Sequence, residues 1–348
     1  MMGGRWRGVL AGLGNHGRRW AEVCRRHPAV ELVGFAGRGA TSRQRAATDW
    51  GVPGERIYGA LGDAIAGTAP DFVLDVTSPE SHREVALASF RAGLPLLQAK
   101  PMSDHYRGAA AIVAAGERAG CIHMIDQNMR FSALPRLTRK LFDGGAIGAP
   151  GQLDIVFAKP WADYPGTHYV TEPWMFLLDM GCHHFDMLRY VVGAEPEAVR
   201  VVSWNPAWGW HAGDASHVAV FEFPGGLVAV HRASGCSTGA ATPWHGAWRI
   251  EGPEGSITWE EERVFVTREH RTDQPRRDEI AAPEPAARSG PEAVLDEFLA
   301  ALAERREPEC SGRDNLGTMA MTFAAVRSAR QGGRRVRLTE ITEAAPGP

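Results

Sequence analysis

"WRGVLAGLGNHGRRWAEVCRR", residues 6–26, carries the clearest indication of fold in the sequence. A short apolar run leads into the turn GLGNHG at residues 12–17, and a helical pattern of apolar residues follows. In this strand–turn–helix context the spacing predicts a dinucleotide-binding turn. Gly12 permits the tight turn, Gly14 lets a pyrophosphate approach the backbone, and Gly17 lets the helix pack on the strand. A plain glycine turn is the alternative, because the chain contains 40 glycines.

The second apolar run, "VELVGFA" at residues 30–36, predicts which dinucleotide binds. NAD-binding domains usually carry an acid for the ribose diol about 20 residues after the glycine turn begins. Here Gly37 stands at that place and Arg38 follows it. A guanidinium pairs with a 2′-phosphate, whereas a carboxylate repels it. The sequence therefore favours NADP(H), with NAD(H) as the alternative; Arg43 and Arg45 also lie nearby or form a solvated helix face.

Two further runs, "DFVLDVT" at 71–77 and "LPLLQA" at 94–99, are apolar enough to be parallel strands buried on both faces. Ser78-Pro79 follows the first and Lys100-Pro101 follows the second. Cofactors bind at the carboxyl ends of such strands, so the ammonium of Lys100 is predicted to reach the binding cleft. A solvated loop lysine is the alternative.

The rest of the chain predicts a second domain of a different kind. "CIHMIDQNMRF" closes the first domain near Asn128, and seven short strands between 152 and 269 then form a largely antiparallel sheet. Residues 271–292 are expected to be an exposed loop, followed by helices at 293–305 and about 315–331. We predict an α/β plus α+β fold: a Rossmann domain at 1–128 and an open-faced sheet domain at 129–348. The helix at about 315–331 is expected to pack back on the first domain.

Composition narrows the class of protein. The 348 residues are 44% hydrophobic and carry a formal net charge of −3, so the composition lacks the excess of positive charge that is typical of nucleic-acid-binding proteins. No apolar run approaches the roughly 20 residues needed to span a bilayer, and the start lacks a secretory signal. The five cysteines are scattered, odd in number and without a C-x-x-C pair, so reduced thiols and a cytoplasmic location are expected.

A polar stripe runs through "LLDMGCHHFDMLRY", residues 177–190. Asp179, His183, Asp186 and Tyr190 recur at steps of four, three and four, which places them along one side of a helix. Oxidation of a secondary alcohol needs a proton acceptor poised near neutral pH, a role that suits an imidazole, and a cation for the developing oxyanion, a role that suits a lysine. A carboxylate beside the imidazole orients it or holds a substrate hydroxyl.

Two alternatives apply to this stripe. Asp186 and Tyr190 could bond to neighbouring backbone, and we expect Asp186 to be structural. A metal site built from Asp179, His183, His184 and Asp186 is disfavoured, because His184 points about 100° away from His183 on a helix. We expect no metal.

The stretch "KPWADYPGTHYVTEPW", residues 159–174, is long, proline-punctuated and aromatic, as functional lids often are. Eight of the eleven tryptophans lie between 161 and 259, where they could stack on a sugar or simply cover a sheet or a subunit interface. The candidate substrate-binding residues are Asn128, Trp161, Tyr164, His168 and Tyr169.

Several motifs together resemble the glucose–fructose oxidoreductase / inositol dehydrogenase / MocA (Gfo/Idh/MocA) family almost end to end. They are "GLGNHG", "TSPESH", "AKP", "NMRF", "LLDMGCHHFD" and the closing "DNLGTMAMTFAAVRSARQGGRRVRL". The resemblance implies an NAD(P)-dependent dehydrogenase or reductase acting on sugars, inositols or related polyols, and a homodimer or homotetramer formed through the sheet.

By position, the resemblance implies Lys100, Asp179 and His183 as the catalytic set, with Pro79 and His82 beside the cofactor. The full set of expected cofactor-binding residues is Gly12, Gly14, Asn15, His16, Gly17, Arg38, Thr77, Ser78, Pro79, His82 and Lys100. Two departures from the family pattern matter. The family's usual E-K-P is Ala99-Lys100-Pro101 here, which removes a carboxylate next to the lysine, and the glycine pair that often precedes the catalytic aspartate is replaced by "EPWMFLL", residues 172–178.

Two other activities remain open on the same fold. One is redox-assisted cleavage of a glycosidic bond with a tightly bound, recycled cofactor. The other is a non-enzymatic, cofactor-sensing regulator, which the missing glutamate favours and the intact lysine, aspartate and histidine oppose.

Overall fold

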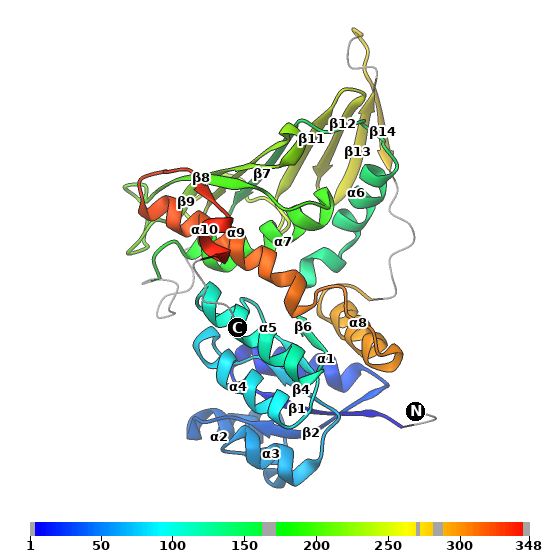
Figure 1. Cartoon of the computed structure of the whole chain (residues 1–348), viewed down its shortest axis with the longest axis vertical. Coiled ribbons are helices and arrows are strands. Elements are labelled where there is room, and N and C mark those ends of the chain that lie inside the picture. Colours follow the sequence, from blue (N-terminus) through cyan, green and yellow to red (C-terminus); the bar gives the residue numbers. More distant parts are fainter. Residues whose placement is uncertain (1–3, 162–171, 269–271, 281–287, 344–348) are drawn as a thin grey trace. The chain divides into compact units, whose positions relative to one another are not determined.

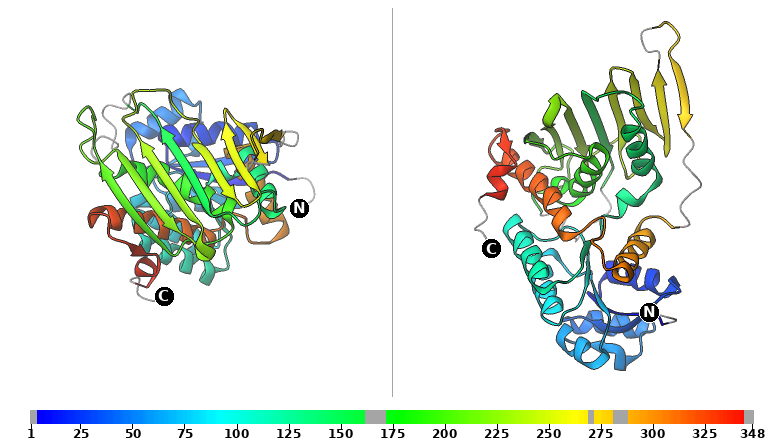
Figure 2. Two further views of the ribbon diagram at one scale, coloured as in Figure 1. Left: turned by 90° about the horizontal axis from the view of Figure 1, so that it is seen from above. Right: turned by 45° about the vertical axis from the view of Figure 1, so that its right-hand side comes forward.

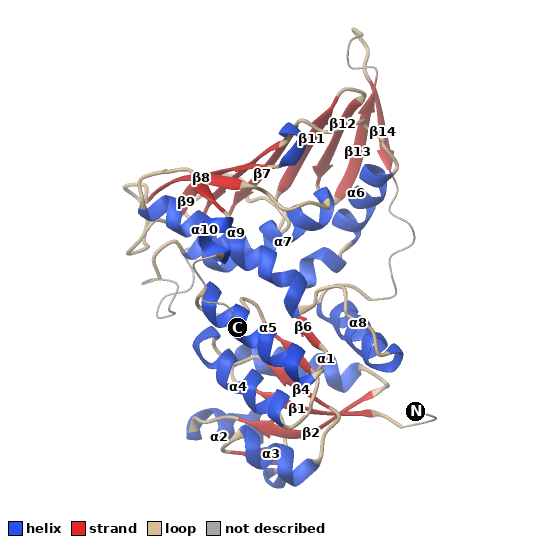
Figure 3. Cartoon of the chain, in the orientation of Figure 1, coloured by secondary structure: helices blue, strands red, loops and turns tan. Residues whose placement is uncertain are grey.

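The computed structural model describes residues 4–161, 172–268, 272–280 and 288–343 of the chain. Contacts within the chain divide it into two compact units. The first comprises Met1–Asn128 with Arg288–Leu316, and the second comprises Met129–Ala287 with Gly317–Ala345. Each unit is built around one β-sheet (Figures 1 and 3).

The sheet of the first unit has six parallel strands in the order β3-β2-β1-β4-β5-β6. They are β1 (Trp6–Ala11), β2 (Val30–Ala36), β3 (Ile57–Tyr58), β4 (Phe72–Asp75), β5 (Leu96–Gln98) and β6 (His123–Ile125). The central strands are apolar because both of their faces are covered: Leu10, Leu74 and Leu97 have no exposed surface.

Six helices belong to the first unit and lie on both faces of this sheet (Figure 1). They are α1 (Asn15–Arg26), α2 (Ala40–Asp49), α3 (Leu61–Thr68), α4 (Pro79–Arg91), α5 (Tyr106–Ala119) and α8 (Pro291–Glu304). α4 packs on α5, and α8 packs on α1. The alternation of strand and helix confirms the predicted Rossmann arrangement.

The sheet of the second unit has nine strands in the order β14-β13-β12-β11-β7-β10-β9-β8-β15. They are β7 (Gln152–Ala158), β8 (Ala198–Trp204), β9 (Ser216–Glu222), β10 (Val228–Ser234), β11 (Ala247–Gly252), β12 (Gly255–Glu260), β13 (Arg263–Arg268), β14 (Arg276–Ile280) and β15 (Val336–Arg337). All pairs are antiparallel except β7 with β10, so the prediction of a mainly antiparallel sheet is confirmed.

One face of this second sheet carries helices. They are α6 (Ala133–Asp143), α7 (Gly181–Val192), α9 (Gly312–Arg330) and the short α10 (Thr339–Thr342). α9 begins in the first unit and continues in the second. The other face is open in the described part of the chain (Figure 2), where Val202 and Trp204 of β8 and Val228 of β10 are exposed.

One predicted segment is wrong. Residues 271–292 were expected to be a loop, but Arg276–Ile280 form β14, which pairs with β13 as the edge of the sheet. Its sequence, RRDEI, lacks the alternation of apolar and polar residues that marks a half-buried strand. The arginines and acids of an edge strand face solvent, and they leave no apolar signal to find.

Candidate active site

The turn after β1 meets steric requirements that only glycine satisfies. Gly12 has a φ of +106°, and a Cβ there would lie 2.6 Å from the carbonyl oxygen of Val76. A Cβ on Gly17 would lie 2.0 Å from the carbonyl oxygen of Gly12. A Cβ on Gly14 would meet no described atom within 4 Å, and no side chain caps the start of α1 at Asn15. An open turn against an uncapped helix N-terminus fits a dinucleotide pyrophosphate.

This turn also lies where the strand order of the sheet reverses. β1 has β2 on one side and β4 on the other, so the turn after β1 lies beside the loop after β4. Gly12 contacts Val76 and Thr77 in that loop, and Ser78 and Pro79 begin α4. In open α/β sheets such a switch point is where ligands bind.

Gly37, the residue after β2, is packed too closely for the side chain of an acid. A Cβ on Gly37 would lie 2.8 Å from the side chain of Leu13. Arg38 follows with its side chain 75% exposed, bonded to Ser81 Oγ at 2.7 Å and 3.7 Å from a carboxylate oxygen of Glu84. Ser81, in the first turn of α4, thus holds the guanidinium of Arg38 at the edge where the cofactor ribose is expected.

His82 ties together the loops that follow β4 and β5. Its side chain is fully buried, with Nε2 3.0 Å from the carbonyl oxygen of Thr77 and Nδ1 3.0 Å from that of Pro101. Both partners are backbone carbonyl oxygens, which accept hydrogen bonds. Burial raises the pKa of Asp75, and electrostatic attraction to His82 counteracts that rise. His82, predicted to lie beside the cofactor, thus contacts the backbone of two loops.

Lys100 lies two residues after the end of β5 and is half-buried. Electrostatic attraction joins it to Asp126, which follows β6 and is 4% exposed. Asp126 Oδ2 accepts a hydrogen bond from Trp20 Nε1 at 3.2 Å and lies 3.9 Å from His16 Nε2. Asp126 is not among the site residues predicted from the sequence; the signal for it is an acid directly after the apolar strand β6, which pairs with the strand before Lys100.

In the second unit, the polar stripe begins in a π-helix, Phe176–Met180, which runs into α7. The backbone leading into it is strained, because Trp174 has a φ of +54°. Trp174 is held by a hydrogen bond from its Nε1 to Ser203 Oγ at 3.2 Å and by the guanidinium of Arg330 over its ring. π-helical turns of this kind are frequent at functional sites.

The four members of the stripe have different environments. Asp179 belongs to the π-helix and is half-buried, and His183 lies in the first turn of α7 with 7% of its surface exposed. Asp186 is buried in a bidentate ion pair with Arg130 and also accepts from Thr318 Oγ1 at 3.1 Å. This contact supports the structural role predicted for Asp186.

Tyr190, the last member of the stripe, is also committed to local packing. Its hydroxyl accepts a hydrogen bond from Arg136 Nη1 at 2.9 Å, and the guanidinium groups of Arg136 and Arg130 lie over its ring.

His184 is turned away from the stripe toward the sheet. Its Nε2 donates to the carbonyl of Trp244 at 2.9 Å, and its Nδ1 lies 2.8 Å from His231 Nε2. His231 Nδ1 in turn lies 2.9 Å from His217 Nε2. Burial lowers the pKa of His217 to about 3 and that of His231 well below its ordinary value. His184 therefore belongs to a buried chain of hydrogen bonds.

The candidate substrate residues are only partly within the described chain. Tyr164, His168 and Tyr169 lie outside the described residues. Trp161 is 7% exposed and packs edge-to-face on Phe176, within the apolar cluster under the sheet. Asn128 begins a short 3₁₀ turn, Asn128–Phe131, and is half-buried.

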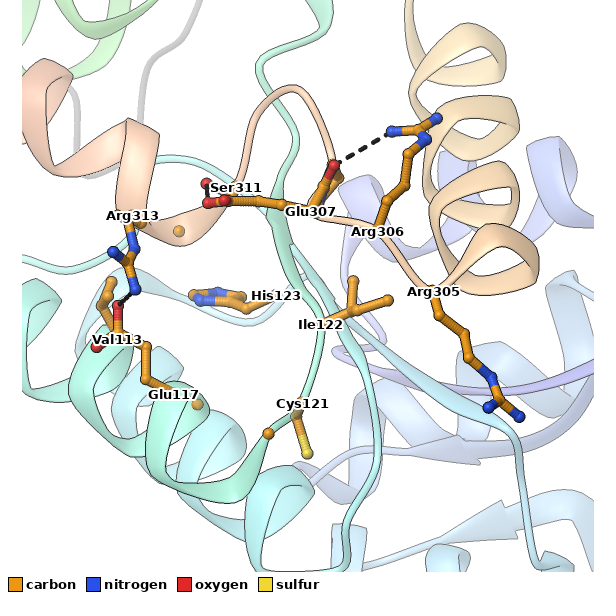
Figure 4. Close-up of a pocket in the computed structure, with 14 residues that line it drawn as sticks. Val113, Glu117, Cys121, Ile122, His123, Arg305, Arg306, Glu307, Ser311 and Arg313 are labelled. Carbon is orange, nitrogen blue, oxygen red and sulfur yellow. Dashed lines mark hydrogen bonds and ion pairs between the residues drawn. The ribbon is translucent and has the colours of Figure 1, made fainter.

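A pocket of about 260 Å³ in the first unit lies at the opposite end of its sheet (Figure 4). Cys121 and Ile122, which precede β6, line it together with α5 and the segment between α8 and α9. Arg313 reaches across to Glu117 at 2.7 Å. Dinucleotides bind at the carboxyl ends of the strands, so this pocket at an amino end is not the cofactor site.

The described residues also bear on metal sites and membrane spans. Among these residues no three or more histidine, cysteine or acidic side chains gather as a group that could hold a metal ion. None of the described helices has the length and apolar character needed to cross a bilayer.

Known proteins resemble both units. Residues 6–127 match the family model described as "Oxidoreductase family, NAD-binding Rossmann fold", and residues 136–258 match the "GFO/IDH/MocA C-terminal domain". D-apiose dehydrogenase from Paraburkholderia graminis is 27% identical over 98% of this chain and 92% of its own length. Inositol 2-dehydrogenase from Rhizobium meliloti is 28% identical over 80% of this chain and 86% of its own length.

Solved structures share the fold. A crystal structure of an oxidoreductase from Agrobacterium radiobacter, in complex with NAD⁺, L-tartaric acid and magnesium, superposes with a TM-score of 0.84. It is 22% identical and covers 97% of this chain and 99% of its own. Together with the switch-point turn, the lysine after β5 and the two matched family models, this identifies the chain as a member of the Gfo/Idh/MocA family of oxidoreductases, with an NAD-binding Rossmann domain followed by that family's C-terminal domain.

Proposed function

We propose that the protein is an NADP-preferring dehydrogenase or reductase that acts on a secondary alcohol or ketone of a sugar, inositol or related polyol. The observation that carries the proposal is the edge of the first sheet, where the glycine turn, Thr77 and Lys100 follow the neighbouring strands β1, β4 and β5. The names of the relatives, a D-apiose dehydrogenase and an inositol 2-dehydrogenase, support the substrate class.

In this proposal the chain supplies proton transfer and charge stabilisation. NADP⁺ or NAD⁺, held by the glycine turn and the loop after β4, would supply the hydride acceptor. His183 takes the hydroxyl proton of the substrate, and Asp179, on the same side of the helix, orients the imidazole or a neighbouring hydroxyl. The ammonium of Lys100 stabilises the oxyanion that develops on the reacting carbon.

The substrate class is tested by screening purified protein with both nicotinamide cofactors against sugars, inositols, polyols and nucleotide sugars. Oxidation or reduction of at least one secondary alcohol or ketone, measured as a change in nicotinamide absorbance, is the expected result. Substrate conversion without net use of added cofactor would instead favour cleavage of a glycosidic bond with recycled cofactor. Cofactor binding without turnover of any compound would favour a sensor.

NADP preference is tested at Arg38. Replacing it with alanine removes the guanidinium expected to pair with the 2′-phosphate, so KM for NADP⁺ should rise by about tenfold or more while KM for NAD⁺ changes little. Arg45→Ala, on the exposed side of α2, is the matched control and should leave both values unchanged. Equal use of both cofactors by the unaltered protein would refute the preference, and so would equal losses in Arg38→Ala.

The open face of the second sheet supports a homodimer or homotetramer. Val202 is 64% exposed and Trp204 41% exposed, although both belong to a regular strand. Val218 and Val220 of the neighbouring β9 lie on the same face by register. A second copy of the chain is the proposed partner that covers this face.

A further inference from the structure

The pairing of β5 with β6 brings an acid beside Lys100. The two strands are parallel, with Gln98 opposite Ile125. The ladder continues one residue further, because Asp126 N donates to the carbonyl of Gln98 at 2.8 Å. Asp126 therefore lies opposite Ala99, the residue directly before Lys100, at the carboxyl edge where the cofactor is expected.

Asp126 is buried, so its ionisation depends on the charged groups around it. Its side chain is 4% exposed, so an ionised carboxylate there is costly unless it is paired. Oδ2 accepts from Trp20, and Oδ1 is buried without a hydrogen bond to any described residue. The cations that act on it electrostatically are Lys100, after β5, and Arg19, on α1.

We propose that Asp126 is the positioning residue of Lys100, holding the ammonium at the sheet edge and serving as its countercharge. The proposal rests on the proposed function, in which Lys100 stabilises the substrate oxyanion. It also explains how the lysine keeps a carboxylate partner although position 99 is alanine: the neighbouring strand provides one at the position opposite. His16 and Trp20, one turn apart on α1, connect the same carboxylate to the helix that follows the glycine turn.

The pairing predicts a pH dependence. Burial raises the pKa of Asp126 to about 6, against the lowering effects of Trp20, Lys100 and Arg19. The carboxylate is therefore charged above about pH 6 and neutral below it. The charged or titratable groups that act on it are His16 and Arg19 of α1 and Lys100, two residues after β5. The countercharge of Lys100 is therefore lost as the pH falls through about 6.

The chain offers a direct measurement, because Lys100, Lys140 and Lys159 are its only lysines. Reductive methylation with ¹³C-formaldehyde gives each lysine a separate NMR signal, and Lys100→Met assigns that of Lys100. In Asp126→Asn, which keeps the shape and an acceptor for Trp20, the pKa of Lys100 should fall by about one unit or more. Asp126→Glu, which keeps the charge, should restore most of it.

Internal and external controls separate this effect from general damage. The signals of Lys140 and Lys159 should titrate alike in all variants. Asp63→Asn, which removes an exposed acid of α3 in the same unit, should leave Lys100 unchanged. The turnover number of Asp126→Asn should fall about tenfold, with a smaller change in KM. An unchanged pKa of Lys100 in folded Asp126→Asn would overturn the proposal.

The failure of this inference differs from the failure of the proposed function. Wild-type turnover in Lys100→Met would refute the role of the lysine itself, whatever Asp126 does. An inactive Lys100→Met combined with a Lys100 signal that ignores Asp126→Asn would leave the proposed function standing and remove only the countercharge.

Discussion

Asp186 shows how a polar residue on a catalytic-looking stripe can be structural. It lies three residues after His183, about one helical turn away on the same face, yet Arg130 and Thr318 bind its carboxylate. Both ends of the ion pair are nearly inaccessible, at 4% and 1% of their surface. The spacing of polar residues therefore predicts which of them share a helix face. Burial of a side chain in an ion pair then identifies a structural residue among them, as at Asp186.

The first prediction concerns this ion pair. Asp186→Ala leaves the guanidinium of Arg130 buried without its charge partner, so the free energy of unfolding should fall by about 3–5 kcal/mol. The control is Asp143→Ala, which breaks a 2.8 Å pair with Arg139 on the exposed side of α6 and should cost about 1 kcal/mol or less. Urea denaturation measures both; equal losses in the two variants would contradict the structural role.

The sequence predicts residues well when a single local pattern specifies them, and poorly when the partner is remote. The glycines of the turn after β1 could be predicted because their spacing alone encodes the turn. Asp126 could not, since its importance depends on the pairing of β5 with β6, and its partner Trp20 lies 106 residues away. Whether the predicted substrate residues Tyr164, His168 and Tyr169 contact substrate stays a prediction.

At the scale of elements, the π-helix at Phe176–Met180 and the chain of histidines under the sheet are the features that the sequence did not predict. A π-helical turn has the same residue preferences as an α-helix, and here a strained Trp174 precedes it. The histidines lie on α7, β9 and β10, so no short stretch of sequence reveals that they meet. β14 escaped prediction for another reason, because an edge strand needs no apolar face.

The second prediction follows from the buried histidines. His217 and His231 are neutral in the folded protein, because burial depresses their pKa values far below the 6.5 of an unfolded chain. Their contribution to stability is complete above pH 6.5 and declines as the pH falls toward about 3, since only the unfolded state binds the protons. Each should add about 1.4 kcal/mol per pH unit to the decline.

The test compares the unaltered protein with His217→Gln, whose amide can still donate to His231. Urea denaturation between pH 6.5 and 4.5 should give a slope shallower by about 1.4 kcal/mol per pH unit in the variant. An identical slope would mean that His217 does not stay neutral on folding.

At the scale of the whole molecule, the sequence predicted both sheets and the class of each. The parallel strands of the first unit are apolar throughout and alternate with helices, and the short alternating strands of the second unit indicate an antiparallel sheet. The order of the strands within each sheet could not be predicted from local sequence patterns. The parallel pairing of β7 with β10 joins strands that are 76 residues apart in register, Gln152 with Val228, and no local pattern signals it.

The third prediction concerns assembly. Val202→Glu places a charge in the middle of the exposed apolar face, and a dimer that buries this face should lose affinity because an unpaired carboxylate is costly to desolvate. Sedimentation velocity should show a dimer or tetramer for the unaltered protein and a smaller species for the variant. Val228→Thr, a milder change on the same face, should keep the assembly. If the unaltered protein is a monomer, the exposed sheet face is not a subunit interface.

The central claim is that Lys100 and His183 carry the chemistry, and the most direct test is the turnover number of Lys100→Met and His183→Ala on a substrate found by the screen. Each variant should lose a factor of about 10²–10⁴ in kcat, while its cofactor affinity, measured by quenching of tryptophan fluorescence, should stay within a few-fold of that of the unaltered protein. Near-normal turnover in both variants would contradict it.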